Sequence, residues 1–302
     1  MPSSLLATLD SFLSGSPTDR SHQKPIAVFD CDGTLIQGDI GEAMFFRQIE
    51  EFQFRTSPAN LWLDHPKRDE IDNLYESLAA IPHPKRKIDR RFNPFCQILL
   101  NRYFDQLANG DIEKACADIV RLLAGFSLRE VGVLARATLR AELEAPPGKR
   151  QIGKTSLPLG IRYIQDTLDA IEHLKNRGFD LWAISGSNQW AVETVFERAG
   201  IPRERILGIE LKIDGDILTS EIRKPIPILD GKIEAMKART NQVPLMVFSD
   251  SPIDLPLFRY ASGMKVLINS RTRTSAEFFS TAGVKKDKSW IVVEQPTLVT
   301  NE

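Results

Sequence analysis

The sequence predicts an α/β fold with a parallel sheet and a helical region inserted after the first strand. Three observations support this prediction. An apolar run, 26–29, ends abruptly in the polar segment Asp30–Thr34, as a buried strand does where it opens into a loop. From residue 161 onward, helical and strand-like patterns alternate, which is typical of a parallel sheet. Between these parts, residues 39–150 show long helical patterns and no convincing strand.

The alternating half provides most of the predicted Rossmann-like core, which we place at residues 1–38 and 151–302. Short apolar runs predict strands at 179–184, 245–248 and 265–268. Apolar periodicity predicts helices at 161–177, 189–199, 233–239 and 255–260. The runs 206–213 and 217–222 flank Asp214-Gly215, which predicts a β-hairpin.

The inserted region, 39–150, is interpreted as a helical lid. Its periodicity predicts helices at 95–107, 111–123 and 128–143. Its middle, 57–94, is rich in proline and charge and is predicted to be loop with short helices. Before the first strand, residues 1–15 are predicted to form a short surface helix. They lack a basic start, and Asp10 interrupts their apolar stretch, so they resemble a signal peptide only weakly.

Composition excludes several classes of protein. Lysine and arginine number 39 against 40 aspartates and glutamates, which gives no reason to expect nucleic acid or an anionic membrane as partner. No apolar run approaches the ~20 residues that a membrane span needs. The 3 cysteines form no close metal-type pair, so we expect a reducing compartment and a cytoplasmic protein. The basic run 85–91 is interpreted as a solvated loop. Oligomeric state is not predicted.

Two carboxylates, Asp30 and Asp32, follow the first strand, and Gly33 lets the chain turn sharply. Sites in parallel α/β sheets form outside the carboxyl ends of the strands. One carboxylate there is suited to act as the nucleophile that forms an aspartyl phosphate, and the second as general acid and then general base. The alternative is a loop in which both residues cap turns.

A hydroxyl-rich segment, Ser185-Gly186-Ser187, follows a second predicted strand and precedes a helix. Hydroxyl and backbone N–H groups in that position make a cradle for an anion, although Ser-Gly-Ser is also a plain turn. A lysine is needed to balance phosphate charge. We prefer Lys232, at the start of a helical pattern, over Lys224, which precedes a proline in an extended stretch.

A further pair of carboxylates, Asp250 and Asp254, follows the strand at 245–248. Mg²⁺ prefers oxygen ligands and is usually held by one or two carboxylates together with phosphate and water. Asp30 and Asp250 are the preferred pair. Asp32 and Asp254 are included in the candidate metal site, and Asp254 is alternatively placed to orient a metal-bound water or Lys232. The competing interpretation is a helix start capped by Asp250 or Ser251.

These four segments, in this order, resemble the motifs of the haloacid dehalogenase superfamily. The insertion after the first motif resembles its helical cap of the first type, and the whole is most similar to the phosphoserine phosphatase-like branch. Three positions depart from that branch: Ser249 stands in place of its glycine, Ile253 in place of the asparagine of its Asn-Asp pair, and Asp39 in place of its glutamate. The Asp-Ser-Pro segment at 250–252 is closer to phosphocholine-type phosphatases.

The resemblance implies a Mg²⁺-dependent phosphomonoesterase that acts on a small metabolite, phosphoserine-like or phosphocholine-like. Thr34 is expected to position the loop or the hinge of the cap. Asp39, Glu42 and Arg47 are expected to bind charged groups of the substrate. Phe45, Phe46 and Trp62 could add cation–π contact with the substrate. For Phe45 and Phe46, a place in the core of the cap is the stronger interpretation. A phosphotransferase or phosphomutase of the same fold, or a catalytically silent binding protein, remains an alternative.

Overall fold

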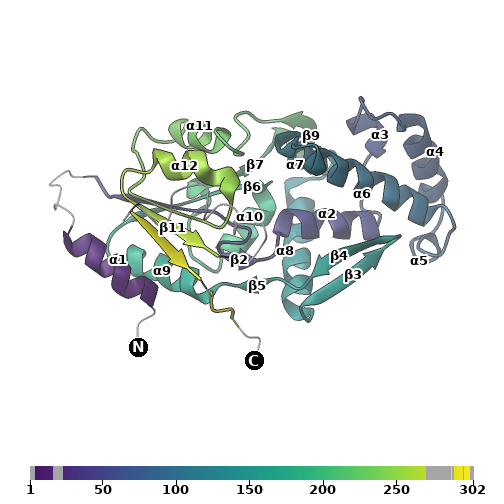
Figure 1. Ribbon diagram of the computed structural model, residues 1–302. Coiled ribbons are helices and arrows are strands. Elements are labelled where there is room, and N and C mark those ends of the chain that lie inside the picture. Colours follow the sequence, from purple (N-terminus) through teal and green to yellow (C-terminus); the bar gives the residue numbers. More distant parts are fainter. Residues whose placement is uncertain (1–3, 16–22, 270–286, 288, 295, 300–302) are drawn as a thin grey trace.

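A six-stranded parallel sheet forms the centre of one lobe of the molecule (Figure 1). The structure is a computed structural model that describes residues 4–15, 23–269, 287, 289–294 and 296–299. The strands follow the order β12-β11-β10-β1-β6-β7, with every neighbouring pair parallel. Their bounds are β1 Ile26–Phe29, β6 Asp180–Asn188, β7 Ile206–Ile209, β10 Met246–Ser249, β11 Met264–Ile268 and β12 Trp290–Val293. The predicted fold class is confirmed, whereas β12 was not anticipated.

Helices cover both faces of this sheet. On one face lie α1 (Ser4–Gly15), α9 (Gln165–Asn176) and α10 (Gln189–Phe196), and on the other lie α11 (Gly231–Lys237) and α12 (Leu255–Tyr260). Short 3-10 turns span Arg203–Arg205 and Pro252–Asp254. In β1, Ala27 and Phe29 pack on the first face while Ile26 and Val28 pack on the second. The strand is therefore apolar at every position rather than alternating.

The second lobe is helical and lies beside the sheet lobe (Figure 1). Its helices are α2 Ile40–Glu50, α3 Pro58–Leu61, α4 Arg68–Ala79, α5 His83–Arg86, α6 Phe92–Ala108, α7 Ile112–Arg121 and α8 Leu128–Glu144. The three long helices predicted here are confirmed as α6, α7 and α8. In the segment predicted as mostly loop, α4 is a full 12-residue helix. An apolar cluster rich in aromatic rings, including Phe52, Trp62 and Phe95, holds this lobe together.

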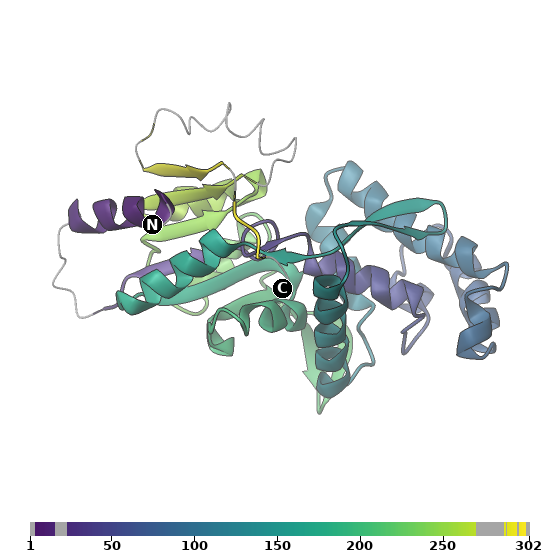
Figure 2. The same cartoon turned by 90° about the horizontal axis from the view of Figure 1, so that it is seen from below.

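A β-hairpin corrects the expectation that this region contains no strand. It consists of β3 (Gly148–Ile152) and β4 (Thr155–Leu159), which pair antiparallel and extend along the helical lobe (Figure 2). Ile152 and Leu157 belong to the apolar cluster of that lobe. The expected boundary between residues 150 and 151 falls inside β3, so we propose that the lid continues to about Gly160.

The two chain segments that join the lobes are paired with each other. β2 (Ile36–Gln37) and β5 (Arg162–Tyr163) form an antiparallel pair. Gly38 and Gly160 follow and precede these strands, and both have positive φ, at 109° and 93°. The helix predicted from residue 161 therefore begins later, at Gln165, because the preceding residues are used in this pairing.

The predicted hairpin around Asp214-Gly215 is present and contacts the helical lobe. The run 206–213 divides into β7, which joins the main sheet, and β8 (Leu211–Asp214), which pairs with β9 (Ile217–Ile222). Leu218 exchanges backbone hydrogen bonds with the loop before α8: its carbonyl accepts from Gly125 at 2.8 Å and its N–H donates to Phe126 at 2.9 Å. The backbone thus ties this hairpin of the sheet lobe directly to the lid.

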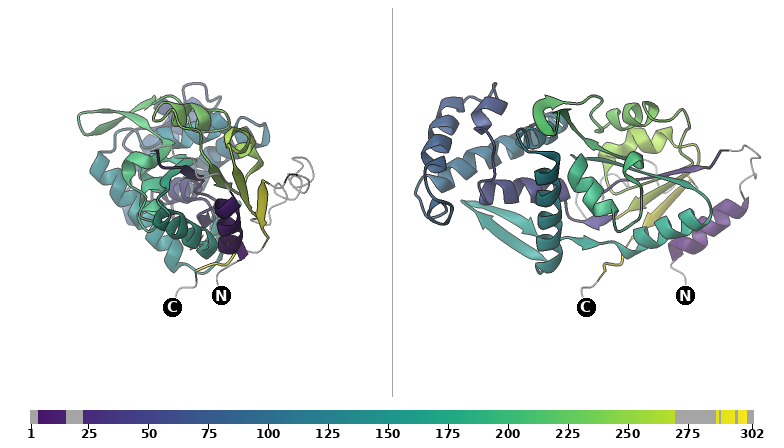
Figure 3. Two further views of the ribbon diagram at one scale, coloured as in Figure 1. Left: turned by 90° about the vertical axis from the view of Figure 1, so that its left-hand side faces the viewer. Right: turned by 180° about the vertical axis from the view of Figure 1, so that it is seen from behind.

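The N-terminal helix α1 packs beside α9 at the surface of the sheet lobe (Figure 3). Leu5 and Leu9 face the core and are buried, and Asp10 pairs with His173, at 2.8 Å, and with Arg177. The short helix expected here is confirmed over the residues described. Among the helices of the described residues, none has the length and apolar character that crossing a membrane requires.

Candidate active site

The loop after β1 is held tightly against the end of β10. The N–H of Asp30 donates to the carbonyl of Phe248 at 2.9 Å, so pairing with β10 continues to this residue. Gly33 has φ of 71°, and a Cβ atom at this position would lie 2.1 Å from Oδ2 of Asp250. Only glycine fits there, because its lack of a side chain lets the Asp250 carboxylate lie against the loop that carries Asp30 and Asp32. The first and fourth motifs therefore meet.

Lys232 lies between two carboxylates. Its Nζ donates to Oδ1 of Asp30 at 2.9 Å and to Oδ2 of Asp254 at 2.7 Å. Lys232 is only 2% exposed to solvent. Burial opposes the ammonium charge, but Asp254 and Asp30 outweigh this effect and hold the pKa of Lys232 above its ordinary value. Lys224, the alternative, is exposed and pairs with Glu113 at 2.9 Å. The geometry therefore supports Lys232 as the lysine of the site.

Burial raises the pKa of Asp30 to about 7, although the neighbouring Lys232 ammonium lowers it. The negative charges of Asp254 and Asp32 add to the increase. A carboxylate in this setting gains stability when a cation binds beside it.

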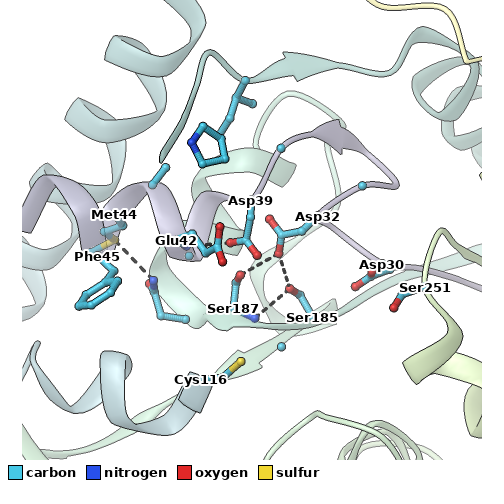
Figure 4. Close-up of a pocket in the computed structure, with 18 of the residues that line it drawn as sticks. Asp30, Asp32, Asp39, Glu42, Met44, Phe45, Cys116, Ser185, Ser187 and Ser251 are labelled. Atoms are coloured by element: carbon cyan, nitrogen blue, oxygen red, sulfur yellow. Dashed lines mark hydrogen bonds between the residues drawn. The ribbon is translucent and has the colours of Figure 1, made fainter. Parts of the chain in front are cut away.

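Asp32 is held by three donors in the protein. Its Oδ1 accepts from the N–H of Ile40 at 2.8 Å, and its Oδ2 accepts from the hydroxyls of Ser187, at 2.7 Å, and Ser185, at 3.2 Å (Figure 4). Burial, followed by the negative charge of Asp39, raises the pKa of Asp32 to about 7. The side chain can thus exist in both protonation states near neutral pH, as a group that gives and takes a proton must.

The segment Ser185-Gly186-Ser187 lies within β6, which runs on to Asn188, rather than in a loop after the strand. The N–H of Ser187 donates to Oγ of Ser185 at 3.0 Å, which turns the Ser185 hydroxyl toward Asp32. Asn188 then caps α10 by accepting from the N–H of Ala191 at 2.9 Å.

The first turn of α2 brings two further carboxylates to the same place. Asp39 caps this helix by accepting from the N–H of Glu42 at 2.7 Å, and Oε1 of Glu42 accepts from the hydroxyl of Tyr103 at 3.0 Å. At Gly41, a Cβ would lie 2.5 Å from Oγ of Ser187, so a glycine is needed for α2 to approach β6 this closely. Burial and the charge of Glu42 raise the pKa of Asp39 to about 7, and burial also raises that of Glu42.

These side chains line one cavity of about 850 Å³ at the junction of the two lobes. Its charged lining residues in the described part of the chain are one lysine, Lys232, and six carboxylates: Asp30, Asp32, Asp39, Glu42, Glu142 and Asp250. Ser185, Gly186 and Ser187 also line it. The lid contributes a largely apolar wall that includes Met44, Phe45, Phe46, Leu107, Ile112, Cys116, Ile119, Val120 and Leu123.

Four residues proposed from the sequence lie outside this cavity. Thr34 is buried below the loop, where its carbonyl accepts from Oγ1 of Thr167 at 2.7 Å. Arg47 points to a separate hollow between α2 and α8, so we remove it from the substrate site. Trp62 is buried in the lid and donates to the Asp118 carbonyl at 2.9 Å. Asp254 is fully buried behind Lys232.

Sequence reasoning missed three residues that shape the site. Ser249 donates to Oδ2 of Asp254 at 2.6 Å and so fixes the carboxylate that holds Lys232. Its only signal in the sequence was a hydroxyl at the end of the strand. Tyr103 and Gly41 gave no signal, because their partners are distant in the sequence. Ser251 caps the turn that follows, with its Oγ accepting from the N–H of Ile253 at 3.4 Å, as the helix-start interpretation proposed.

The residues present fit Mg²⁺. Asp30 and Asp250 both line the cavity, and the glycine cradle at Gly33 brings the Asp250 carboxylate against the Asp30 loop. Within the described residues, no group of three or more histidine, cysteine or acidic side chains could hold a metal by itself. Two carboxylates completed by substrate oxygens and water are the usual Mg²⁺ arrangement. The side chain of Asp32 accepts from hydroxyls, and that of Asp254 accepts from Lys232 outside the cavity lining, so Asp30 and Asp250 stay the preferred pair, and a role of Asp32 and Asp254 at the metal stays a prediction.

Comparison with known proteins places the chain in a family. Among solved structures, a protein of unknown function from Anaerococcus prevotii superposes with a TM-score of 0.76 at 17% identity, over 94% of this chain and 90% of that one. Another from Bordetella pertussis gives 0.53 at 14% identity, over 90% and 99%. A substrate-bound phosphoserine phosphatase gives only 0.47 at 14% identity, over 90% and 94%, which is too low to bear on the substrate. No match was found among curated proteins. The family model for haloacid dehalogenase-like hydrolases matches residues 27–259, which include Asp30, Ser185, Lys232 and Asp250, and the chain therefore belongs to this family.

Proposed function

We propose that this protein is a Mg²⁺-dependent phosphomonoesterase that acts on a small phosphorylated metabolite through a phosphorylated Asp30. The observation that most supports this proposal is the position of Asp30. Its carboxylate lines the cavity and accepts from Lys232, and the loop that carries it contacts the Asp250 carboxylate at Gly33. A carboxylate suited to act as nucleophile, a buried ammonium and a second carboxylate for the metal are groups with which a protein can carry out phosphoryl transfer through an aspartyl phosphate.

The phosphate would bind between Lys232 and the hydroxyls of Ser185 and Ser187. Lys232 already serves two carboxylates, so its charge alone does not balance a phosphate dianion. A Mg²⁺ ion held by Asp30 and Asp250 would supply the remaining positive charge. Phosphoryl transfer depends mainly on such charge balance and on in-line positioning.

In the first step, an oxygen of Asp30 attacks phosphorus while the bond between phosphorus and the leaving oxygen breaks. Asp32 donates its proton to the alkoxide that departs. Asp32 must be neutral at that moment, and burial together with Asp39 raises its pKa to about 7, which favours the neutral form. The hydrogen bonds from Ile40, Ser185 and Ser187 fix the direction in which the proton is presented.

In the second step, Asp32 is a carboxylate and takes a proton from water. The resulting hydroxide oxygen attacks phosphorus, the bond between phosphorus and Asp30 breaks, and inorganic phosphate leaves. Asp30 returns to its carboxylate form and Asp32 to its neutral form, so the cycle closes. Transfer to a second alcohol in place of water would use the same residues and would make the protein a phosphotransferase.

The test is turnover of an aryl phosphate with Mg²⁺, followed by acid quenching and peptide mapping. We expect release of inorganic phosphate and a labelled acyl phosphate on the peptide that contains Asp30. Accumulation of a phosphorylated alcohol instead of inorganic phosphate would indicate a transferase. Absence of turnover on every phosphomonoester tried would support a silent binding protein and overturn the proposal.

A further inference from the structure

We propose that the alcohol carrying the phosphate bears a positively charged nitrogen and has no carboxylate. This inference rests on the proposed function, because that function places the phosphate at Asp30 and the leaving oxygen at Asp32. It narrows the two substrate types that the sequence suggested. An aminoalkyl phosphate such as phosphocholine fits the cavity, whereas phosphoserine does not.

The first argument is the charge on the cavity wall. Six carboxylates line the cavity, of which Glu142 is paired with Arg150 behind the wall, and Lys232 is the one cation among the described lining residues. Lys232 already forms ion pairs with Asp30, at 2.9 Å, and with Asp254, at 2.7 Å. A carboxylate on the leaving group would therefore find no cation of its own. Placing like charges together at a binding site is a common way in which proteins exclude a wrong ligand.

The second argument is the place of two of these carboxylates relative to the general acid. Asp39 and Glu42 stand on the first turn of α2, and Figure 4 shows them beside Asp32. Ile40, which follows Asp39, donates its N–H to Asp32 at 2.8 Å. Since Asp32 must reach the leaving oxygen, the rest of the alcohol extends toward Asp39 and Glu42. A cationic nitrogen a few bonds from the ester oxygen would lie against both.

The third argument is the surface that surrounds this acidic pair. The rings of Phe45 and Tyr103 pack against each other at a tilt, with centroids 5.4 Å apart, and both residues line the cavity together with Met44 and Cys116. Aromatic rings and thioethers favour a weakly hydrated, alkylated ammonium over a bare one, because they contact its methyl groups and attract its charge. Arg47, the one cation of α2, points to the other hollow and cannot bind a substrate carboxylate here.

The test compares four substrates: phosphocholine, phosphoethanolamine, phosphoserine and dimethylbutyl phosphate, the uncharged isostere in which carbon replaces the choline nitrogen. We expect kcat/KM for phosphocholine to exceed that for its isostere about tenfold or more, with phosphoserine the poorest. Phosphoethanolamine should fall between phosphocholine and the isostere, because it has the charge without the methyl groups.

Two variants locate the effect. Glu42→Gln still accepts from Tyr103, and Asp39→Asn still caps α2, since asparagine is among the best N-cap residues. In each, the ratio of kcat/KM between phosphocholine and its isostere should fall about fivefold or more. Glu76→Gln on α4 makes the same chemical change on an exposed surface outside the cavity and should leave the ratio unchanged.

The ratio is measured on one protein preparation, so a partly folded variant does not distort it. Equal turnover of phosphocholine and its isostere, or preference for phosphoserine, would overturn the inference. The proposed function would still stand in that case, because hydrolysis of an aryl phosphate is measured in parallel. If no phosphomonoester were hydrolysed, the aryl phosphate included, both the proposed function and the proposed substrate class would be overturned.

Discussion

Replacing Asp30 by asparagine should abolish turnover and yet stabilise the metal-free protein at neutral to alkaline pH. The amide has nearly the same shape as the carboxylate but carries no charge, so the variant cannot form the acyl phosphate. The carboxylate itself is costly in the absence of a metal, because it is buried beside Asp32 and Asp254 with only Lys232 to balance them. Removing the charge removes that cost.

The magnitude follows from the pKa of Asp30. Burial raises this pKa from 3.8 to about 7. Each tenfold change in protonation corresponds to about 1.4 kcal/mol, so the ionised form is disfavoured in the folded protein by up to about 4 kcal/mol. The favourable effect of Lys232 is already contained in this value, because its ammonium lowers the pKa. The variant should therefore gain as much as about 4 kcal/mol in free energy of unfolding where the wild-type carboxyl is ionised.

The sign of the pH dependence is fixed by the direction of the pKa change. Between about pH 4 and about pH 7 the folded protein holds a proton on Asp30 that the unfolded chain has lost, so wild-type stability falls as pH rises through this range. The asparagine has no proton to lose. The advantage of Asp30→Asn should therefore be small near pH 4, grow toward pH 7 and stay constant above it.

Urea unfolding of wild type and variant at about pH 5 and about pH 8, with chelator or with Mg²⁺, measures this difference. Mg²⁺ should stabilise the wild type more than the variant and thereby shrink or reverse the gap. Asp105→Asn, an exposed change on α6, should behave as wild type under all conditions. A metal-free variant that is less stable than wild type at about pH 8 would refute the electrostatic reasoning, and retained turnover would refute the role of Asp30.

Three further predictions concern the metal, the lysine and the lid. Chelation should abolish phosphate release and Mg²⁺ should restore it, with Ca²⁺ restoring little because its looser coordination spoils the in-line geometry; undiminished turnover after metal removal would contradict this. Lys232→Ala should lower kcat about a hundredfold or more, whereas Lys224→Ala should change it less than about twofold, and comparable losses would show that the assignment of the lysine is wrong. Asp118→Ala should cost about 1–3 kcal/mol in urea unfolding, because Arg102 and Gln106 lose the buried carboxylate to which both donate, although Arg102 keeps Asp64 at 2.7 Å; no measurable loss would speak against this network.

The candidate site was predictable wherever a chemical group follows a strand directly. Asp30 and Asp250 each come after an apolar run, and a parallel sheet brings the carboxyl ends of its strands to one edge. The prediction that these two carboxylates lie at the same edge does not depend on knowing that β1 and β10 are adjacent in the sheet. Ser185 followed the same logic, although its strand continues further than its apolar run indicates.

Predictions failed where a side chain's direction depends on packing. Because α2 is buried on nearly all sides, its apolar periodicity does not show which face of the helix meets the cavity. Arg47 was therefore predicted to reach the substrate, whereas it lines a separate hollow. The hairpin β3–β4 was missed because its first strand is largely exposed and shows no apolar alternation. Tyr103 reaches Glu42 across 61 residues of chain, a contact to which no local pattern points.

By itself, the sequence determined the α/β class, the insertion after the first strand and the carboxylates of the first and fourth motifs, because these depend on short-range patterns of burial and polarity. Only the tertiary structure gave a reason to prefer Lys232 to Lys224 and placed Asp254 and Arg47 outside the cavity. It also showed that, among the described lining residues, one lysine faces six carboxylates, of which Glu142 is paired with Arg150. The physical reason is that charge balance in a cavity is a property of groups brought together by folding. Lys232 and Asp30 are 202 residues apart in the chain and 2.9 Å apart in space.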